Sequence, residues 1–244
     1  APNQFEWAPI FQRSSVASDY NMLAMEVLRR VAEKQGLTVL FHEKPFARVN
    51  GSGKHNNWSI GTNVFGTLFD PLEDGSTNNL FLLSVAALLR GVDLHQDLLR
   101  WSISGIGNDH RLGGHEAPPA IISVFLGDYV GGLVESLITG KPLPPPADIN
   151  LPLGVGHLPR RDRDNTDRNR TSPVAFTGNK FEVRGVGASQ NPAHSSYVLN
   201  TIMADSFDHF ANVIEKKIQQ GKDVKTAIKE LLQETLSQHK RIIN

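Results

Sequence analysis

Apolar residues recur at helical spacing near the start of the chain. The residues concerned are Tyr20, Leu23, Ala24, Val27, Leu28 and Val31. Spacings of three and four residues put such side chains on one side of an α-helix. Ser18 is a suitable N-cap and Gly36 a suitable residue to end the helix. The pattern therefore predicts a helix between Ser18 and Gly36, and the β-rich residues 37–41 predict a short strand after it.

The remaining pattern alternates strands and helices. We expect a strand around Trp58, helices over 78–90 and 92–104 separated at Gly91, a buried strand over 121–126, a short helix over 128–139, a strand over 181–186, and helices over 197–219 and 223–239. Residues 141–153 contain five prolines and are typical of a stiff linker. Interspersed helices and strands joined by polar, glycine-rich loops favour a single α+β domain, with function in the loops.

The amino-acid composition excludes several classes of protein. The chain has 244 residues, 39% of them hydrophobic, and 25 basic residues balance 25 acidic ones. This content argues against a disordered chain, and no apolar run reaches the roughly 18–20 residues that span a membrane. Because there is no cysteine, disulfides and thiolate chemistry are excluded. We expect a cytoplasmic protein. Nucleic-acid binding through 160–170 is disfavoured, since aspartates interrupt the arginines and no aromatic residue is interleaved.

Two loops concentrate residues that suit anionic ligands. The first, Asn50-Gly51-Ser52-Gly53-Lys54-His55, is similar to a phosphate-binding loop but lacks the Ser or Thr that follows the lysine. Its glycines would let backbone N–H groups approach an anion, although a plain surface turn is an equally simple interpretation. The second loop, residues 108–118, contains Arg111, which suits carboxylate capture, and Glu116, a possible base; a solvated loop is the alternative.

A third group of charged residues follows at 168–184. Glu182 and Arg184 are two residues apart in a predicted strand, so their side chains lie on the same face. A carboxylate beside a guanidinium suits a metal ion and a phosphate, and an unliganded surface ion pair explains the pattern equally well. Arg170 belongs to the same group, whereas Glu6 taken alone indicates nothing.

Taken in order, these segments resemble a known family. Glu6, NGSGKH at 50–55, RLGGHEAP at 111–118, RNRTS at 168–172 and FEVR at 181–184 are similar to the catalytic domain of glutamine synthetase. HEKPF…NGSGKHNNWS at 42–59 and NRTSPVAFTGNKFEVR at 169–184 resemble the type III subgroup in particular. The resemblance implies ATP-dependent joining of ammonia to glutamate through a γ-glutamyl phosphate, with two divalent ions, Mg²⁺ or Mn²⁺, in each site.

The resemblance also implies a role for individual residues. It assigns Glu6, His55 and Glu182 to metal binding, Asn50, Gly51 and Arg111 to glutamate binding, Ser59 and Phe11 to nucleotide binding, Arg170 and Arg184 to the transferring phosphoryl group, and Glu116 to a flap that closes the site and takes a proton. The chain departs from the commoner family pattern at two positions and in one longer segment, 127–167. Ala175 stands where a further arginine is expected, which removes one substrate contact, and Asn57 stands where a second histidine is common, as the type III pattern implies.

The fold that the resemblance implies is a largely antiparallel active-site sheet backed by helices. Residues 1–244 would form part of one catalytic domain, with a type III insertion at 127–167. Other metal-binding carboxylates and a small β-grasp domain would lie outside the chain, so we expect the chain alone to be inactive. The resemblance further implies a homo-oligomer, a dodecamer of two hexameric rings with sites between subunits. Two other functions stay open: ligation of glutamate to an organic amine, and a catalytically dead structural relative.

Overall fold

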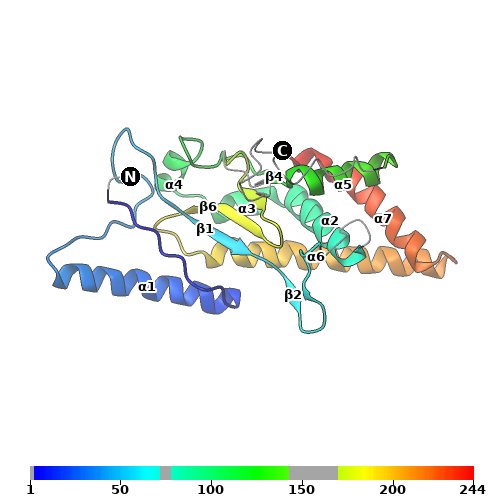
Figure 1. Ribbon diagram of the computed structural model, residues 1–244, viewed down its shortest axis with the longest axis horizontal. Helices are drawn as coiled ribbons and strands as arrows, with labels where there is room; N and C mark the ends of the chain where they lie inside the picture. The colour runs from blue at the N-terminus through cyan, green and yellow to red at the C-terminus, as the bar shows by residue number, and fades with distance from the viewer. Residues whose placement is uncertain (1–2, 72–77, 143–169) are drawn as a thin grey trace, which may run out of the picture.

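The computed structural model describes residues 3–71, 78–142 and 170–244. Its elements, in chain order, are α1 Ser14–Lys34, β1 Gly53–Trp58, β2 Gly61–Thr62, β3 Gly66–Thr67, α2 Asn79–Leu94, α3 Gln96–Ser102, α4 Ile106–Arg111, β4 Val124–Phe125, α5 Gly127–Thr139, β5 Val174–Phe176, β6 Phe181–Gly187, α6 Ala193–Gln219, α7 Val224–His239 and a 3-10 turn Lys240–Ile242. The long helix α6 runs beneath the sheet, and α1 lies beside its N-terminal end, far from α7 (Figure 1).

The main sheet confirms the predicted α+β class. Its strand order is β1-β6-β5-β4, and the pairs β1–β6 and β6–β5 are antiparallel. Strands β4 and β5 run parallel, with Val124 opposite Val174, so the sheet is mainly but not wholly antiparallel. Strands β2 and β3 form a separate hairpin. The central strand β6 contributes both Glu182 and Arg184, which places these residues in the middle of the sheet.

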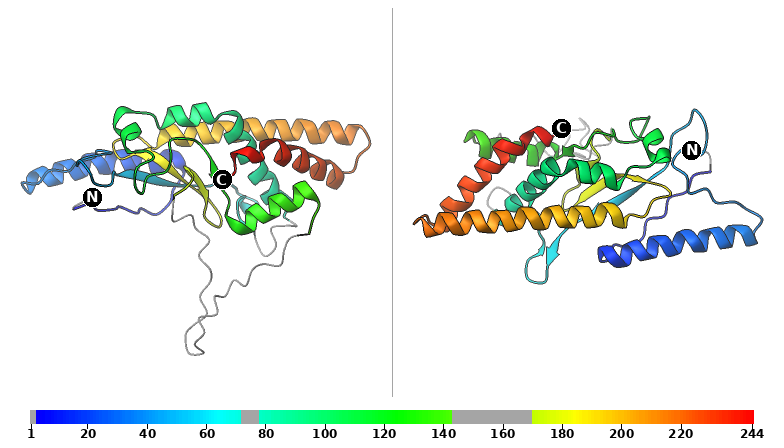
Figure 2. Two further views of the ribbon diagram at one scale, coloured as in Figure 1. Left: turned by 90° about the horizontal axis from the view of Figure 1, so that it is seen from above. Right: turned by 180° about the vertical axis from the view of Figure 1, so that it is seen from behind.

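Helix α2 forms the centre of the hydrophobic core. Its apolar side chains are buried along most of its length, and it packs against α6 and α7. Aromatic rings connect it to the sheet: Phe81 of α2 meets Phe176 of β5, and Phe181 of β6 meets Phe69 edge-to-face, with centroids 4.9 Å apart. Seen from above, α6 runs along one side of the sheet (Figure 2). The hydrophobic core therefore packs against one face of β6 and holds the strand in place.

Strand β1 alternates between the core side and the opposite side. The indole of Trp58 donates to the Oδ1 of Asn200 on α6 at 3.0 Å, and Asn56 approaches Ser195 of the same helix. His55 directly precedes Asn56, so its side chain points to the other face, where Nδ1 is 3.2 Å from a carboxylate oxygen of Glu182. The open face of β1 and β6 thus carries the charged residues.

Strand β6 contains a bulge beside His55. Lys54 pairs with Val186, whereas Asn56 pairs with Val183, so two residues of β6 are opposite a single residue of β1. These two residues are Arg184 and Gly185. An extra residue in a strand shifts the alternation of its side chains. Val183 and Val186 both join the core for this reason, although they are three positions apart.

The predicted helix break at Gly91 is wrong. Helix α2 continues through Gly91 to Leu94, and the chain changes direction at His95. A Cβ atom on Gly91 would lie 3.0 Å from the carbonyl oxygen of Ile202 on α6. Glycine at this position therefore allows a close approach of α2 and α6, and it does not end a helix.

The boundaries of α1 are only partly as predicted. Gly36, with φ of +69°, follows the helix and ends it as expected. Ser18 is not the N-cap, because the helix begins at Ser14 and the Ser18 hydroxyl donates to the Ser14 carbonyl oxygen at 2.8 Å. The helix therefore begins four residues before the predicted cap, and Val16, four residues before Tyr20, extends the apolar pattern into this first turn.

The apolar side of α1 is exposed in the structure. Leu23 is 60% exposed and Val31 is 50% exposed, whereas Met25 and Ala32 are buried. The predicted strand over 37–41 is absent: Leu37 is 66% exposed and Leu40 58% exposed. A strand requires a neighbour for its backbone hydrogen bonds, and no described strand pairs with this segment. The strand predicted over 121–126 is reduced to Val124 and Phe125.

The C-terminal predictions are confirmed. The helices expected over 128–139, 197–219 and 223–239 correspond to α5, α6 and α7, and Asp223 caps α7 by accepting from the N–H of Thr226. Residues 143–169 lie outside the described residues, and with them most of the predicted linker and most of the predicted insertion at 127–167. Across the described ranges, no helix is both long enough and apolar enough to cross a membrane.

Candidate active site

Three predicted site residues meet on the open face of the sheet. Glu182 lies between His55 and Arg184: one carboxylate oxygen is 3.2 Å from His55 Nδ1, and the other accepts a hydrogen bond from Arg184 Nε at 2.6 Å. The Arg184 side chain is 4% exposed, and those of Glu182 and His55 are 20% and 33% exposed. The structure therefore brings together a partly accessible carboxylate, an imidazole and a buried cation.

The environment keeps Glu182 ionised. The hydrogen bond with His55 is the largest influence and, together with Arg184, outweighs the effect of burial, so the pKa of Glu182 falls from 4.5 to about 2. An ionised carboxylate beside an imidazole can bind a hard divalent cation, and the adjacent guanidinium can stabilise a phosphate. The prediction that Glu182 and Arg184 share a face is confirmed by this ion pair.

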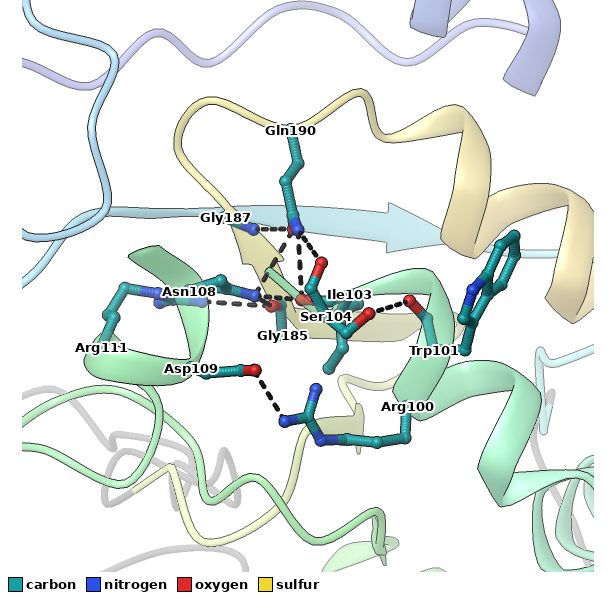
Figure 3. A network of polar contacts seen from close by, with 10 residues as sticks. All are labelled: Arg100, Trp101, Ile103, Ser104, Asn108, Asp109, Arg111, Gly185, Gly187 and Gln190. Atoms are coloured by element: carbon teal, nitrogen blue, oxygen red, sulfur yellow. Dashed lines mark hydrogen bonds and ion pairs between the residues drawn. The ribbon is translucent and has the colours of Figure 1, made fainter. Parts of the chain in front are cut away.

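Arg111 is buried at the end of α4, with 4% of its surface exposed. Its Nε donates to Asn108 Oδ1 at 2.9 Å, and its Nη2 lies 3.2–3.3 Å from the carbonyl oxygens of Arg184, Gly185 and Val186 (Figure 3). Burial lowers the pKa of Arg111 to about 10, so the guanidinium remains charged at neutral pH. Its Nη1 atom faces the glycine loop: a Cβ atom on Gly53 would lie 2.3 Å from it.

The predicted substrate loop packs directly onto this arginine. A Cβ atom on Gly51 would lie 2.5 Å from Arg111 Cγ, so the loop can approach only because the residue is glycine. Asn50 precedes it and is partly exposed. The structure therefore brings together Asn50, Gly51 and Arg111, which sequence reasoning assigned to one substrate.

Glu116 and Arg170 form a second pair. Arg170 Nη1 donates to the Glu116 carbonyl oxygen at 2.9 Å and lies 3.3 Å from its carboxylate. The Glu116 side chain is 70% exposed. The charge of Arg170 also contributes to the lowered pKa of Arg111, after the larger effect of burial. The Glu116–Arg170 pair is therefore near enough to affect the pKa of Arg111, and Glu116 lies on a solvent-exposed loop.

Three predicted residues remain apart from these clusters. Glu6 and Phe11 belong to the segment before α1, and both are exposed, Phe11 by 89%. Ser59 follows β1, where its hydroxyl is 3.0 Å from that of Thr67 and 3.3 Å from the carbonyl oxygen of Asn179. Ala175, where the family has an arginine, is fully buried in β5 directly opposite Glu182, so its side chain points to the same face of the sheet as Glu182.

The described residues fit a metal ion only in part. No group of three or more His, Cys, Asp or Glu side chains suited to a metal occurs within residues 3–71, 78–142 and 170–244. Glu182 and His55 supply one oxygen ligand and one nitrogen ligand, which suit Mn²⁺ and, less well, Mg²⁺. A complete coordination shell needs ligands beyond this pair.

Sequence reasoning missed the residues that hold Arg111. Asn108 is 1% exposed and donates to the carbonyl oxygens of Ile103 and Gly185 at 2.6 and 2.7 Å. Gln190 accepts from Gly187 N–H at 2.7 Å and donates to Ser104 O at 2.9 Å (Figure 3). Glu43 is a third such residue. Gln190 lies outside every recognised segment. Asn108 begins the 108–118 loop and Glu43 lies in the HEKPF segment, but sequence reasoning gave neither residue a role.

Comparisons with known proteins indicate the class of protein. Residues 1–92 match the family described as glutamine synthetase, catalytic domain. This match includes β1 and the glycine loop and ends before Arg111, Glu182 and Arg184.

The chain belongs to the glutamine synthetase family. It is 47% identical over 243 residues to the type-3 glutamine synthetase of Dictyostelium discoideum, covering 100% of this chain and 33% of that protein. It is 45% identical over 239 residues to a glutamine synthetase of Bacteroides fragilis, covering 97% of this chain and 33% of the relative. A glutamine synthetase of Butyrivibrio fibrisolvens is 41% identical over 243 residues, with 100% and 34% covered. The chain spans about a third of the length of these relatives.

Proposed function

We propose that this chain contributes part of the active site of an enzyme that joins ammonia to L-glutamate, with ATP hydrolysed to ADP and phosphate. The observation that carries the proposal is Glu182, held ionised between His55 and the buried Arg184 on the open face of the sheet. Phosphoryl transfer requires charge neutralisation and positioning rather than covalent chemistry from the protein, and this cluster supplies both kinds of charge.

In the proposed reaction, different residues serve phosphoryl transfer, glutamate binding and amide formation. Arg184 and Arg170 stabilise the negative charge of the phosphoryl group as it moves from ATP to the side-chain carboxylate of glutamate. Asn50, Gly51 and Arg111 bind the glutamate. Ammonia then displaces phosphate from the γ-glutamyl phosphate, and the nitrogen loses a proton to Glu116 as the amide forms.

Water must be kept from the acyl phosphate during this reaction. Glu116 lies on the loop after α4 and contacts Arg170, so movement of this loop can close the site over bound substrates. In the proposal Phe11 and Ser59 bind the nucleotide.

Divalent cations belong to the proposal. Glu182 and His55 would hold Mg²⁺ or Mn²⁺, and such an ion would neutralise charge on the ATP phosphates. We propose that Glu6 and carboxylates outside the described residues complete the ligand sets. We also propose a homo-oligomer with sites between subunits, a dodecamer of two hexameric rings. A cytoplasmic location stays a prediction.

ADP release by the full-length protein tests the proposal. We expect turnover that requires both glutamate and ammonium, and a loss of more than about a hundredfold in Glu182→Ala, the order seen when a charge-stabilising group is removed. Glu33→Ala, which changes an exposed residue of α1, is the matched control and should behave as wild type. Turnover with organic amines but not ammonium would assign the protein to amine ligation instead. No turnover with either would favour a catalytically dead relative.

A further inference from the structure

Glu43 is a buried acidic residue with no role in the reaction proposed above. It is 4% exposed. One carboxylate oxygen, Oε1, accepts two hydrogen bonds from Ser189, from its N–H at 2.9 Å and from its hydroxyl at 2.6 Å. A buried carboxylate is costly unless it is hydrogen-bonded, so two donors from one residue make this position specific.

Two glycines form the space that the carboxylate occupies. A Cβ atom on Gly187, at the end of β6, would lie 2.4 Å from Glu43 Oε1. A Cβ atom on Gly107, in α4, would lie 2.7 Å from Glu43 Oε2. The carboxylate is therefore in close contact with both the end of β6 and the helix that carries Arg111.

The backbone of the same residue holds the glycine loop. Its carbonyl oxygen accepts from the N–H of Ser52 at 2.7 Å, and a Cβ atom on Gly51 would lie 2.5 Å from that oxygen. Gly51 and Arg111 also touch each other. Glu43 thus contacts both elements that the proposed function assigns to glutamate binding.

Electrostatics agree with this placement. Burial lowers the pKa of Arg111 and the pKa of Lys54, and the negative charge of Glu43 opposes this effect at both residues. Burial raises the pKa of Glu43, but the hydrogen bonds from Ser189, the backbone N–H of Glu43 and the charge of His42 together lower it. The carboxylate is therefore ionised at neutral pH and close to the buried Arg111 and the partly buried Lys54.

We propose that Glu43 is a positioning residue for glutamate: its side chain reaches Ser189 while its backbone holds Ser52, and this fixes the glycine loop against Arg111. The inference rests on the proposed function for the identity of the substrate. It makes a distinct claim: the length of the Glu43 side chain matters more than its charge for positioning the glycine loop. Glutamine at this position has the same length and can still accept from Ser189, whereas aspartate keeps the charge and is one methylene shorter.

Two substitutions in the full-length protein distinguish the effect of the length of the Glu43 side chain from the effect of its charge. We expect Glu43→Asp to raise the KM for glutamate about tenfold, as small misplacements of binding groups do, with the KM for ATP within about twofold of wild type. Glu43→Gln should keep the KM for glutamate within about threefold. Glu33→Asp on α1 is the matched control. An unchanged glutamate KM in Glu43→Asp, an equal rise in both KM values, or a larger effect of Glu43→Gln would overturn the proposal.

Hydrogen exchange tests the same inference without activity. In Glu43→Asp, amides of 50–54 and 106–111 should exchange about tenfold faster than in wild type, while α2 amides stay unchanged. Glu43→Gln should match wild type in all three segments. Equal exchange in wild type and Glu43→Asp would overturn the positioning role. If the wild-type protein shows no turnover, the proposed function fails, and the exchange rates still decide whether Glu43 holds these elements together.

Discussion

Replacing Glu182 by glutamine tests the electrostatics of the candidate site independently of catalysis. Glutamine keeps the shape and can still accept from Arg184, so the substitution removes mainly the charge. A pKa difference of one corresponds to about 1.4 kcal/mol. The lowering of the Glu182 pKa from 4.5 to about 2 therefore corresponds to about 3 kcal/mol in favour of the folded state. Because the side chain is partly solvated, we expect about 2 kcal/mol to be measured.

The contribution of Glu182 to the free energy of unfolding should decrease as the pH falls. A carboxyl group whose pKa is lower in the folded state stabilises that state at pH values above its unfolded pKa. For Glu182 this contribution is complete above about pH 4.5 and is lost as the pH falls from 4.5 to about 2. The stability difference between wild type and Glu182→Gln should shrink over the same range.

Urea unfolding of EDTA-treated protein, followed by circular dichroism, measures this difference at about pH 7 and about pH 3. EDTA removes any contribution from a bound cation. We expect a difference of about 2 kcal/mol at the higher pH and a clearly smaller one at the lower pH. A difference that is the same at both values, or that grows toward acid, would refute the assignment of Glu182 as an ionised partner of His55 and Arg184.

Other substitutions test the packing around the site. Gly53→Ala would place a Cβ atom 2.3 Å from Arg111 Nη1, so we expect the KM for glutamate to rise about tenfold in steady-state assays of the full-length protein. Phe181→Ala removes a fully buried ring that contacts Phe69 and Phe176, and urea unfolding should show a loss of about 3–5 kcal/mol. Gly91→Ala should destabilise by about 1–2 kcal/mol in the same assay, because overpacking against Ile202 outweighs the gain in helix propensity; a stabilised variant would contradict the close approach of α2 and α6.

Local patterns predicted the long elements well and their limits poorly. Helices α5, α6 and α7 and strand β6 were expected from the sequence, whereas β1 was expected only around Trp58 and its first residues were taken for a loop. The errors occurred where tertiary contacts decide the outcome. Gly91 was taken for a helix break, yet its role is to let α6 pass so close that a Cβ atom would lie 3.0 Å from the carbonyl oxygen of Ile202. Residues 37–41 have the composition of a strand, but no described strand lies alongside to complete its hydrogen bonds.

In the candidate site, too, local sequence patterns predicted some residues, and tertiary contacts determined the others. Strand alternation placed Glu182 and Arg184 on one face, and the family resemblance added His55 and Arg111. The role of Glu43 could not be predicted, because its partners at 107, 187 and 189 come together only through the fold. The burial of Arg111 was also unexpected, since an arginine in a glycine-rich loop usually lies in solvent.

The bulge in β6 makes the spacing between Val183 and Val186 a fixed requirement of this chain. Both valines enter the core, and the two residues between them leave three successive carbonyl oxygens directed at Arg111. Deleting Gly185 would remove the bulge and one of the three carbonyl acceptors of the guanidinium, while ordinary alternation would keep Val186 on the core side. A change in the length of β6 would therefore alter the set of acceptors that holds Arg111.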